Sequence, residues 1–278
     1  MVSGAQLSPL RIPFLLCLAL SLISCATGPA PNTPPWFWQA AQDTYRMGDY
    51  LKAIDHLQPL IAPGGEFTER AQPFRLVLTA GLARGYIDLA EAFEAGARMN
   101  EKAATEFRRR MNVYRSQANR RTMNFAESFL AFEKTGPGAA IPIAFPYPSG
   151  NPLPVAELTK AGQGIALSET ELATAERRAI ERAILMVAST AVGAEEDAAK
   201  AQQIFSGQNV TVPKETFLLG MAKQLHGLSQ LYAPAKMNEP DKFQLLNERA
   251  LEALKSIPET PETKALLEKV EKALKPKK

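Results

Sequence analysis

Few side chains in this sequence have the types and spacing that reactions require. The histidines are His56 and His226, and neither lies in a metal-binding spacing such as HExxH or beside a GxSxG serine motif. The acidic run at residues 195–197 follows Gly193 at a predicted helix start, where carboxylates favour the exposed amides and the helix dipole without any catalytic role. We therefore predict no catalytic residues, no metal ligands and no cofactor, and we expect that the protein is not an enzyme.

The side chain with the clearest covalent chemistry is Cys25. It follows a segment with a single basic side chain, Arg11, and an apolar run over residues 12–23. That run is too short for a transmembrane helix, which needs about 20 apolar residues, but it suits a signal-peptide core of about 7 to 15 residues. Cys17 lies inside the segment, so removal of the segment leaves Cys25 as a lone thiol. A lone exposed thiol is unusual in an oxidising compartment. The segment predicts a cleaved secretory signal.

The end of this segment, Leu22-Ile23-Ser24-Cys25-Ala26, resembles the bacterial lipobox. The resemblance implies that the Cys25 thiol takes a diacylglycerol, that a peptidase cuts between Ser24 and Cys25, and that the freed amine takes a further acyl chain such as palmitate. Several chains anchor a protein stably, since each buried methylene contributes about 0.8 kcal/mol. Alanine after the cysteine, in place of aspartate, implies the outer membrane and a periplasm-facing body. An ordinary signal with a chance cysteine is the alternative.

Composition and proline spacing divide the chain into five parts. Residues 1–24 are the predicted signal peptide, and residues 25–35 hold the lipidated cysteine and an uncharged, proline-rich tether. Residues 36–134 and 155–278 are two predicted helical halves, separated by a Pro/Gly-rich loop at residues 135–154. Removing the leader leaves about 250 residues, enough for a sizeable core. The formal net charge of +3 is nearly balanced and gives no support for nucleic-acid binding.

Helix signals dominate both halves, because apolar positions recur at helical spacing and no convincing alternating strand pattern is present. Caps and prolines place the breaks, and one weak point lies near Gly85. The predicted helices cover residues 35–47, 50–61, 66–93, 98–134, 155–162, 168–191, 195–205, 213–232, 240–257 and 261–274. The sequence therefore predicts an all-α fold of antiparallel helical hairpins.

The first pair of predicted helices resembles a tetratricopeptide repeat. Ala41 stands on the first helix, the turn reads Gly48-Asp49-Tyr50, Ala53 follows on the second helix, and Pro63 comes soon after. Small residues at these places let two helix backbones approach closely. The resemblance implies a degenerate solenoid, and an irregular helical bundle is the alternative. The chain also has a faint similarity to the tetratricopeptide lipoproteins that accompany TRAP transporters. This similarity rests on the lipobox, the all-helical body and the segment at residues 114–121.

Two segments are candidate binding surfaces. Arg108, Arg115 and Arg121 belong to an arginine run on one predicted helix, which could hold anionic headgroups, lipopolysaccharide phosphates or an acidic ligand. Neighbouring arginines point around a helix, so a solvated surface with intramolecular pairs is the favoured alternative. Phe145 and Tyr147 lie in a proline-stiffened apolar stretch of the long loop, where they either engage a partner or cover the joint between the helical halves.

From these features we expect a lipid-anchored cell-envelope scaffold that binds a protein partner through its helical surfaces. Its partners are the membrane, through the anchor, and an envelope protein; nucleic acid is not expected. A solute-binding accessory lipoprotein of a transporter is the alternative, and it predicts a closed apolar pocket. An envelope enzyme is a third hypothesis, which requires a clustered acid/base pair that the sequence does not reveal.

Overall fold

A computed structural model describes residues 28–195, 197–207 and 210–275 of the chain. The predicted signal peptide, its cleavage position at Ser24 and the lipidation position Cys25 lie outside the described residues. Ten α-helices and one two-stranded sheet make up the described part, which confirms the all-α prediction. No helix among these residues combines the length and apolar character needed to cross a membrane.

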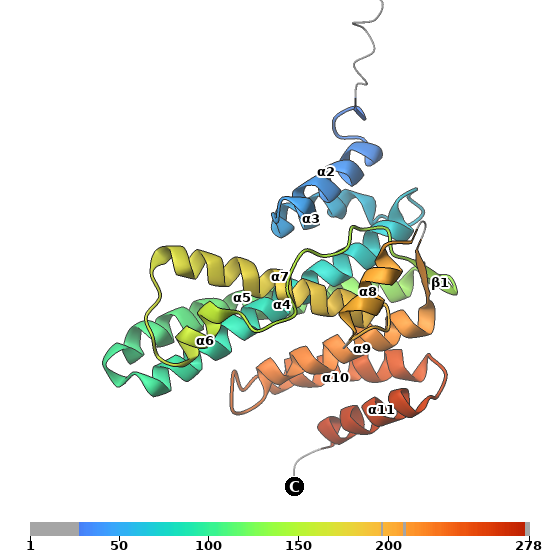
Figure 1. The fold of residues 1–278 in the computed structure, drawn as a ribbon. Coiled ribbons are helices and arrows are strands. Elements are labelled where there is room, and N and C mark those ends of the chain that lie inside the picture. The colour runs from blue at the N-terminus through green and yellow to red at the C-terminus, as the bar shows by residue number, and fades with distance from the viewer. Residues whose placement is uncertain (1–27, 196, 208–209, 276–278) are drawn as a thin grey trace, which may run out of the picture.

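The first two helices of the described residues form a hairpin at one end of the molecule (Figure 1). Helix α2 (Pro34–Arg46) packs on α3 (Tyr50–Leu57), and Gly48 makes the turn between them with φ +80°. The side chain of Asp49 caps α3 by accepting a hydrogen bond from the Lys52 amide. Ala41 and Ala53 are fully buried, as close helix contact requires. The tetratricopeptide resemblance of this pair stays a prediction.

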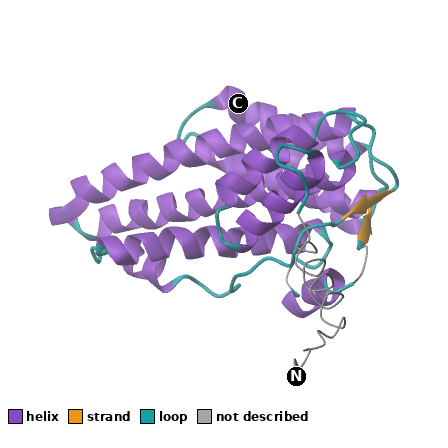
Figure 2. Ribbon diagram, turned by 90° about the horizontal axis from the view of Figure 1, so that it is seen from above, coloured by secondary structure: helices purple, strands orange, loops and turns teal. Residues whose placement is uncertain are grey.

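Three long helices form the middle of the molecule: α4 (Thr68–Met99), α5 (Ala104–Lys134) and α7 (Glu169–Ala191). Helix α4 packs against both others, and the short α6 (Ala156–Gly162) lies across α4 and α7. Seen from above, the long helices run side by side away from the sheet (Figure 2). Helices α4 and α7 come from the two predicted halves of the chain, so the halves share one core.

Helix α4 is continuous where the sequence indicated a weak point near Gly85 and an end at residue 93. A Cβ placed on Gly81 lies 2.5 Å from Ile184 Cγ1, and one placed on Gly85 lies 2.9 Å from Ile180 Cα. These glycines therefore permit a close approach between α4 and α7, since α7 packs where their side chains would stand. Packing of the long helix outweighs the poor helix propensity of glycine, which is about 1 kcal/mol worse than that of alanine.

The last four helices are α8 (Ala198–Phe205), α9 (Lys214–Ser229), α10 (Pro240–Lys255) and α11 (Pro261–Leu274). Of these, α8 lies beside the end of α7 in Figure 1, and the other three follow below the long helices. Thr260 caps α11, which buries Thr263 and Val270 and presents charged residues on its outer side. A terminal helix with one buried stripe and a polar outer face closes the core at this end.

A small antiparallel sheet joins the long loop to the segment before α9. Strand β1 (Ala140–Pro142) pairs with β2 (Thr211–Pro213), with Ile141 opposite Val212. No strand was predicted here, because three residues are too few for a recognisable alternating pattern. Pro142 and Pro213 lack amide hydrogens, which limits further pairing along this sheet.

Candidate functional site

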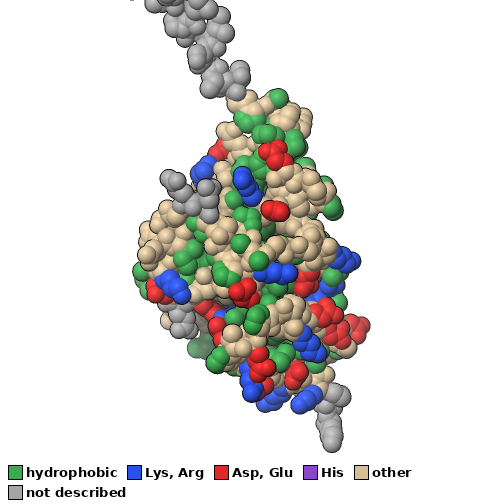
Figure 3. Space-filling model, turned by 90° about the vertical axis from the view of Figure 1, so that its right-hand side faces the viewer, with side chains coloured by type: hydrophobic (Ala, Val, Ile, Leu, Met, Phe, Trp, Pro, Cys, Tyr) green, Lys and Arg blue, Asp and Glu red, His purple; other side chains and the backbone are tan. Residues whose placement is uncertain are grey.

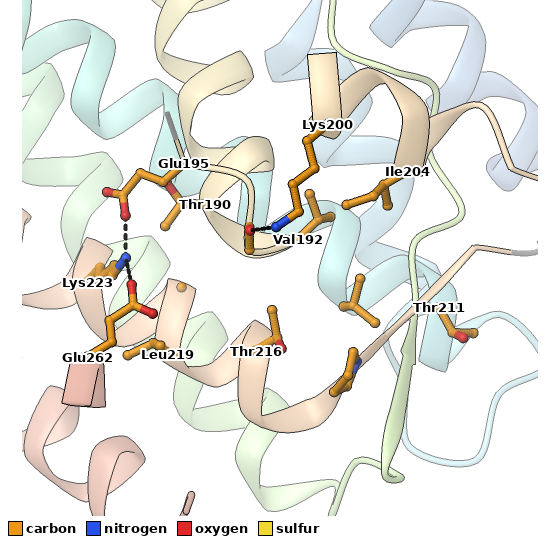
Figure 4. Close-up of a pocket in the computed structure, with 14 residues that line it drawn as sticks. Thr190, Val192, Glu195, Lys200, Ile204, Thr211, Thr216, Leu219, Lys223 and Glu262 are labelled. Atoms are coloured by element: carbon orange, nitrogen blue, oxygen red, sulfur yellow. Dashed lines mark hydrogen bonds and ion pairs between the residues drawn. The ribbon is translucent and has the colours of Figure 1, made fainter. Parts of the chain in front are cut away.

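The site with the most varied side chains is a hollow of about 540 Å³ between the end of α7, α8, β2 and α9 (Figure 4). Its apolar lining includes Val192 and Val212, both at least nine-tenths buried, and the partly buried Ile204 and Leu219. Gly220 lies behind the hollow, where an added Cβ would be 2.8 Å from the Thr190 carbonyl oxygen. Because Gly220 has no side chain, α9 can pack close to α7 at the back of the hollow.

One end of the hollow carries an ionic cluster. The Lys223 ammonium on α9 donates hydrogen bonds to Glu195, in the turn after α7, and to Glu262 in the first turn of α11, the second at 2.7 Å. Burial opposes the charged ammonium, but the bonds to Glu195 and Glu262 outweigh it and raise the pKa of Lys223 above its usual value. The cluster joins three separate elements through one side chain.

The other end of the hollow is built on the turn from α7 to α8. Gly193 ends α7 with φ +71°, a conformation that favours glycine, and its carbonyl oxygen accepts a hydrogen bond of 3.0 Å from Lys200 Nζ. Asp197 accepts a 2.8 Å bond from the Lys200 amide and thereby caps α8. Helix α8 begins at Ala198 and not at residue 195, so the acidic run supplies a cap and, at Glu195, an ion pair.

The charged side chains that line the hollow are already engaged with one another or with the backbone. The groups that remain available to a ligand are the apolar side chains at the floor of the hollow and the hydroxyl groups of Thr211 and Thr216. On the face of the molecule that carries the sheet, basic and acidic side chains intermingle (Figure 3). Such a site suits the binding of an apolar group better than proton transfer or the capture of a highly charged ligand.

No family model matches this sequence, and no curated protein or solved structure matches the chain.

The long loop places its two candidate aromatic residues against the core. The Phe145 ring stacks on Phe74 of α4 with centroids 4.8 Å apart and lies 5.4 Å from the ring of Phe205 on α8. Tyr147 packs edge-to-face against the same Phe205 ring, and its hydroxyl donates to the Ala198 carbonyl oxygen at 3.4 Å. With Phe145 only 5 % exposed, the loop covers a joint between helices, which is one of the two roles considered from the sequence.

The same loop also holds the N-terminal hairpin. Gln42 and Tyr45, both on α2, donate hydrogen bonds to the carbonyl oxygens of Ala144 (3.3 Å) and Pro146 (3.4 Å). We call residues 144–147 the aromatic strap, because they connect α2, α4 and α8, which are far apart in the sequence.

The structure does not bring the three candidate arginines together. Arg115 pairs with Glu94 at 3.1 Å and is only 17 % exposed. Arg108, two turns earlier on the same side of α5, is exposed and forms no ion pair with any described residue. Arg121 points elsewhere around the helix, and burial, followed by the charge of Arg120, lowers its pKa. The run is distributed around α5, with several members in intramolecular pairs.

The two histidines lie apart from the hollow. His226 Nδ1 is 2.7 Å from the side-chain oxygen of Asn247, a buried amide that cannot take up a proton. His56 packs edge-on against Trp36, with ring centroids 5.5 Å apart. Across the described ranges, no group of three or more His, Cys, Asp and Glu side chains is placed to hold a metal ion.

Sequence reasoning missed the Glu195, Lys223 and Glu262 cluster. Its members are 28 and 39 positions apart, and no local pattern relates them. The one available signal was the lysine itself, because Lys223 lies on the half-buried side of α9 among apolar residues and therefore needs an anionic partner.

Proposed function

We propose that this chain is a lipid-anchored cell-envelope protein that acts by binding a partner protein, and that the hollow beside α9 receives an apolar side chain of that partner. The observation that carries the proposal is the composition of the hollow: an apolar floor surrounded by charged side chains that bond to one another or, at Lys200, to the backbone. A ligand that enters gains apolar burial without having to separate an exposed ion pair.

The anchoring part of the proposal rests on the lipobox resemblance around Cys25 and on the short tether. Pro34, the first residue of α2, is nine positions after Cys25. At no more than about 3.6 Å per residue, the tether spans at most about 32 Å. The helical body is therefore held close to the membrane surface, at the outer membrane if the residue after the cysteine sets the destination.

Site-specific cross-linking in the envelope tests the binding part. A photo-cross-linking residue in place of Thr211, exposed at the edge of the hollow, should form an adduct with one defined protein. Thr216→Phe fills the hollow and should abolish that adduct. Gln244→Phe, on the exposed side of α10, is the matched control and should leave it intact. An adduct that survives Thr216→Phe in a protein of unchanged melting temperature places the partner elsewhere.

The anchor is tested independently of the hollow. Cys25→Ser should abolish acylation and leave the chain out of the membrane fraction, because no thiol remains for the diacylglycerol. Unchanged processing and membrane recovery of the Cys25→Ser protein would refute the lipid anchor without affecting the cross-linking result.

A further inference from the structure

A second pocket lies on another part of the molecule, between the α9–α10 turn and the last turn of α11. Its volume is about 300 Å³. The apolar part of its lining comes from Tyr232, Pro234, Pro240, Phe243 and Ala273. The turn and the end of α11 lie near each other in Figure 1. We call this space the lysine-rimmed pocket, because Lys272 and Lys275 complete its lining on the α11 side.

The walls of this pocket are formed before any ligand enters. The Ala233 carbonyl oxygen accepts a hydrogen bond from the Asn238 amide at 3.1 Å, and the Tyr232 carbonyl oxygen accepts one from the Glu239 amide, also at 3.1 Å. Asn238 holds φ +53°, a left-handed conformation that asparagine tolerates better than most residues. Prolines at positions 234 and 240 stiffen the turn further. Binding here requires little ordering of the backbone.

The charge of the lining has one sign. Lys272 and Lys275 are exposed and form no ion pair with a described residue, and no carboxylate lines the pocket. Lysines in the last turn of a helix also compensate its dipole, which is equivalent to about half a negative charge. Two full positive charges exceed that amount, so the rim of the pocket remains attractive to an anion.

From this geometry we infer that the lysine-rimmed pocket binds a small apolar carboxylate, with its hydrocarbon part against Phe243 and the two prolines and its carboxylate toward Lys272 and Lys275. The volume corresponds to that of about ten water molecules in the liquid, and hence to a ligand of about ten non-hydrogen atoms. For a ligand of that size we expect a dissociation constant of about millimolar or tighter. This activity depends neither on the lipid anchor nor on the hollow beside α9.

The probe is phenylacetate, which has this size and charge, with phenylethanol and phenylethylamine as neutral and cationic counterparts. Amide NMR titrations of the purified protein should show saturable shifts around Asn238 and Ala273 that are largest for phenylacetate and smallest for the amine. Converting both lysines to glutamine, Lys272→Gln with Lys275→Gln, should weaken phenylacetate binding about three- to twentyfold, because each exposed charge pair contributes modestly.

Two matched controls lie on the same helix. Ala273→Leu fills the pocket and should abolish binding, whereas Ala265→Leu, at an exposed position, should leave it unchanged. Lys264→Gln with Lys269→Gln removes two exposed α11 lysines outside the pocket and should also leave it unchanged. Any one of three results overturns the inference. They are equal affinity for the acid, the alcohol and the amine, retention of binding in Ala273→Leu, and the lack of a saturable shift at tens of millimolar probe.

Discussion

Replacement of Gly81 by alanine tests whether the close approach of α4 and α7 holds the two predicted halves together. The new Cβ would lie 2.5 Å from Ile184 Cγ1 and 2.8 Å from Ile184 Cα. Carbon atoms in contact normally lie about 3.5 to 4.0 Å apart, so the helices must separate by about 1 Å. Because one of the clashing atoms belongs to the α7 backbone, a change of side-chain rotamer cannot relieve the overlap.

The magnitude follows from two opposing contributions. Overpacking a core costs about 1 to 3 kcal/mol, and this site belongs at the upper end, while alanine gains up to about 1 kcal/mol over glycine in a helix interior. The net loss in the free energy of unfolding is therefore about 2 kcal/mol. For a domain of this size, that corresponds to a fall of about 4 to 8 °C in melting temperature.

Gly227 provides the matched control, since it lies in α9 and an added Cβ there would meet no atom within 4 Å. Gly227→Ala should raise stability by about 0.5 to 1 kcal/mol through helix propensity alone. Thermal and urea unfolding followed by far-UV circular dichroism measure both variants. A Gly81→Ala protein that is as stable as the parent, or a Gly227→Ala protein that loses as much as Gly81→Ala does, would refute the packing argument.

Three further predictions concern the strap, the α7 cap and the ionic cluster. Phe145→Ala should lower the free energy of unfolding by about 3 to 5 kcal/mol, because it removes a buried ring. Tyr147→Phe removes only a hydroxyl group and should change the free energy of unfolding by less than about 1 kcal/mol. Equal effects of the two variants in urea unfolding would contradict the burial of Phe145. Hydrogen bonds from the Ser168 amide, Lys160 and the Ser168 hydroxyl lower the pKa of Glu171 to about 2. The Glu171 carboxylate therefore stabilises the folded protein at pH values above the pKa of about 4.5 that this group has in the unfolded chain, and the stabilisation is lost as the pH falls toward 2. A carboxyl titration midpoint near 4.5 in the folded protein would contradict this, and Glu171→Gln should weaken the acid dependence. Lys223→Met should speed amide hydrogen exchange in α11 more than in α4, because it removes the hydrogen bond to Glu262. An equal increase of the exchange rate in both helices would count against a local role for the cluster.

Local signals predicted the helix ends well because caps and prolines act within a few residues. Asp49 and Thr260 both cap helices at the positions where the sequence indicated starts. The same local reasoning wrongly indicated a break in the helix near Gly85. This glycine permits close packing against α7, about a hundred residues later in the chain. A glycine that weakens an isolated helix and one that permits helix packing look alike in sequence.

The candidate sites depended on partners that local patterns do not identify. The apolar stretch around Phe145 fits either a free surface or a buried cover, and only the contact with Phe74 on α4 shows that the Phe145 ring itself is buried. The lining of the hollow comes from five elements that meet only after α9 packs on α7. No periodicity of a single helix predicts such a meeting, so the sequence indicated the class of fold but not the location of the hollow.

The aromatic strap also determines how a mechanical load enters the molecule. A pull applied ahead of α2 reaches Gln42 and Tyr45, whose bonds lead to the strap, and the Phe145 ring passes the force to α4 and α8 at once. The hairpin therefore does not bear the load alone. Tension at the N-terminus is shared between elements from the early and late parts of the chain, and separating the hairpin from the strap requires the breaking of the hydrogen bonds that Gln42 and Tyr45 donate.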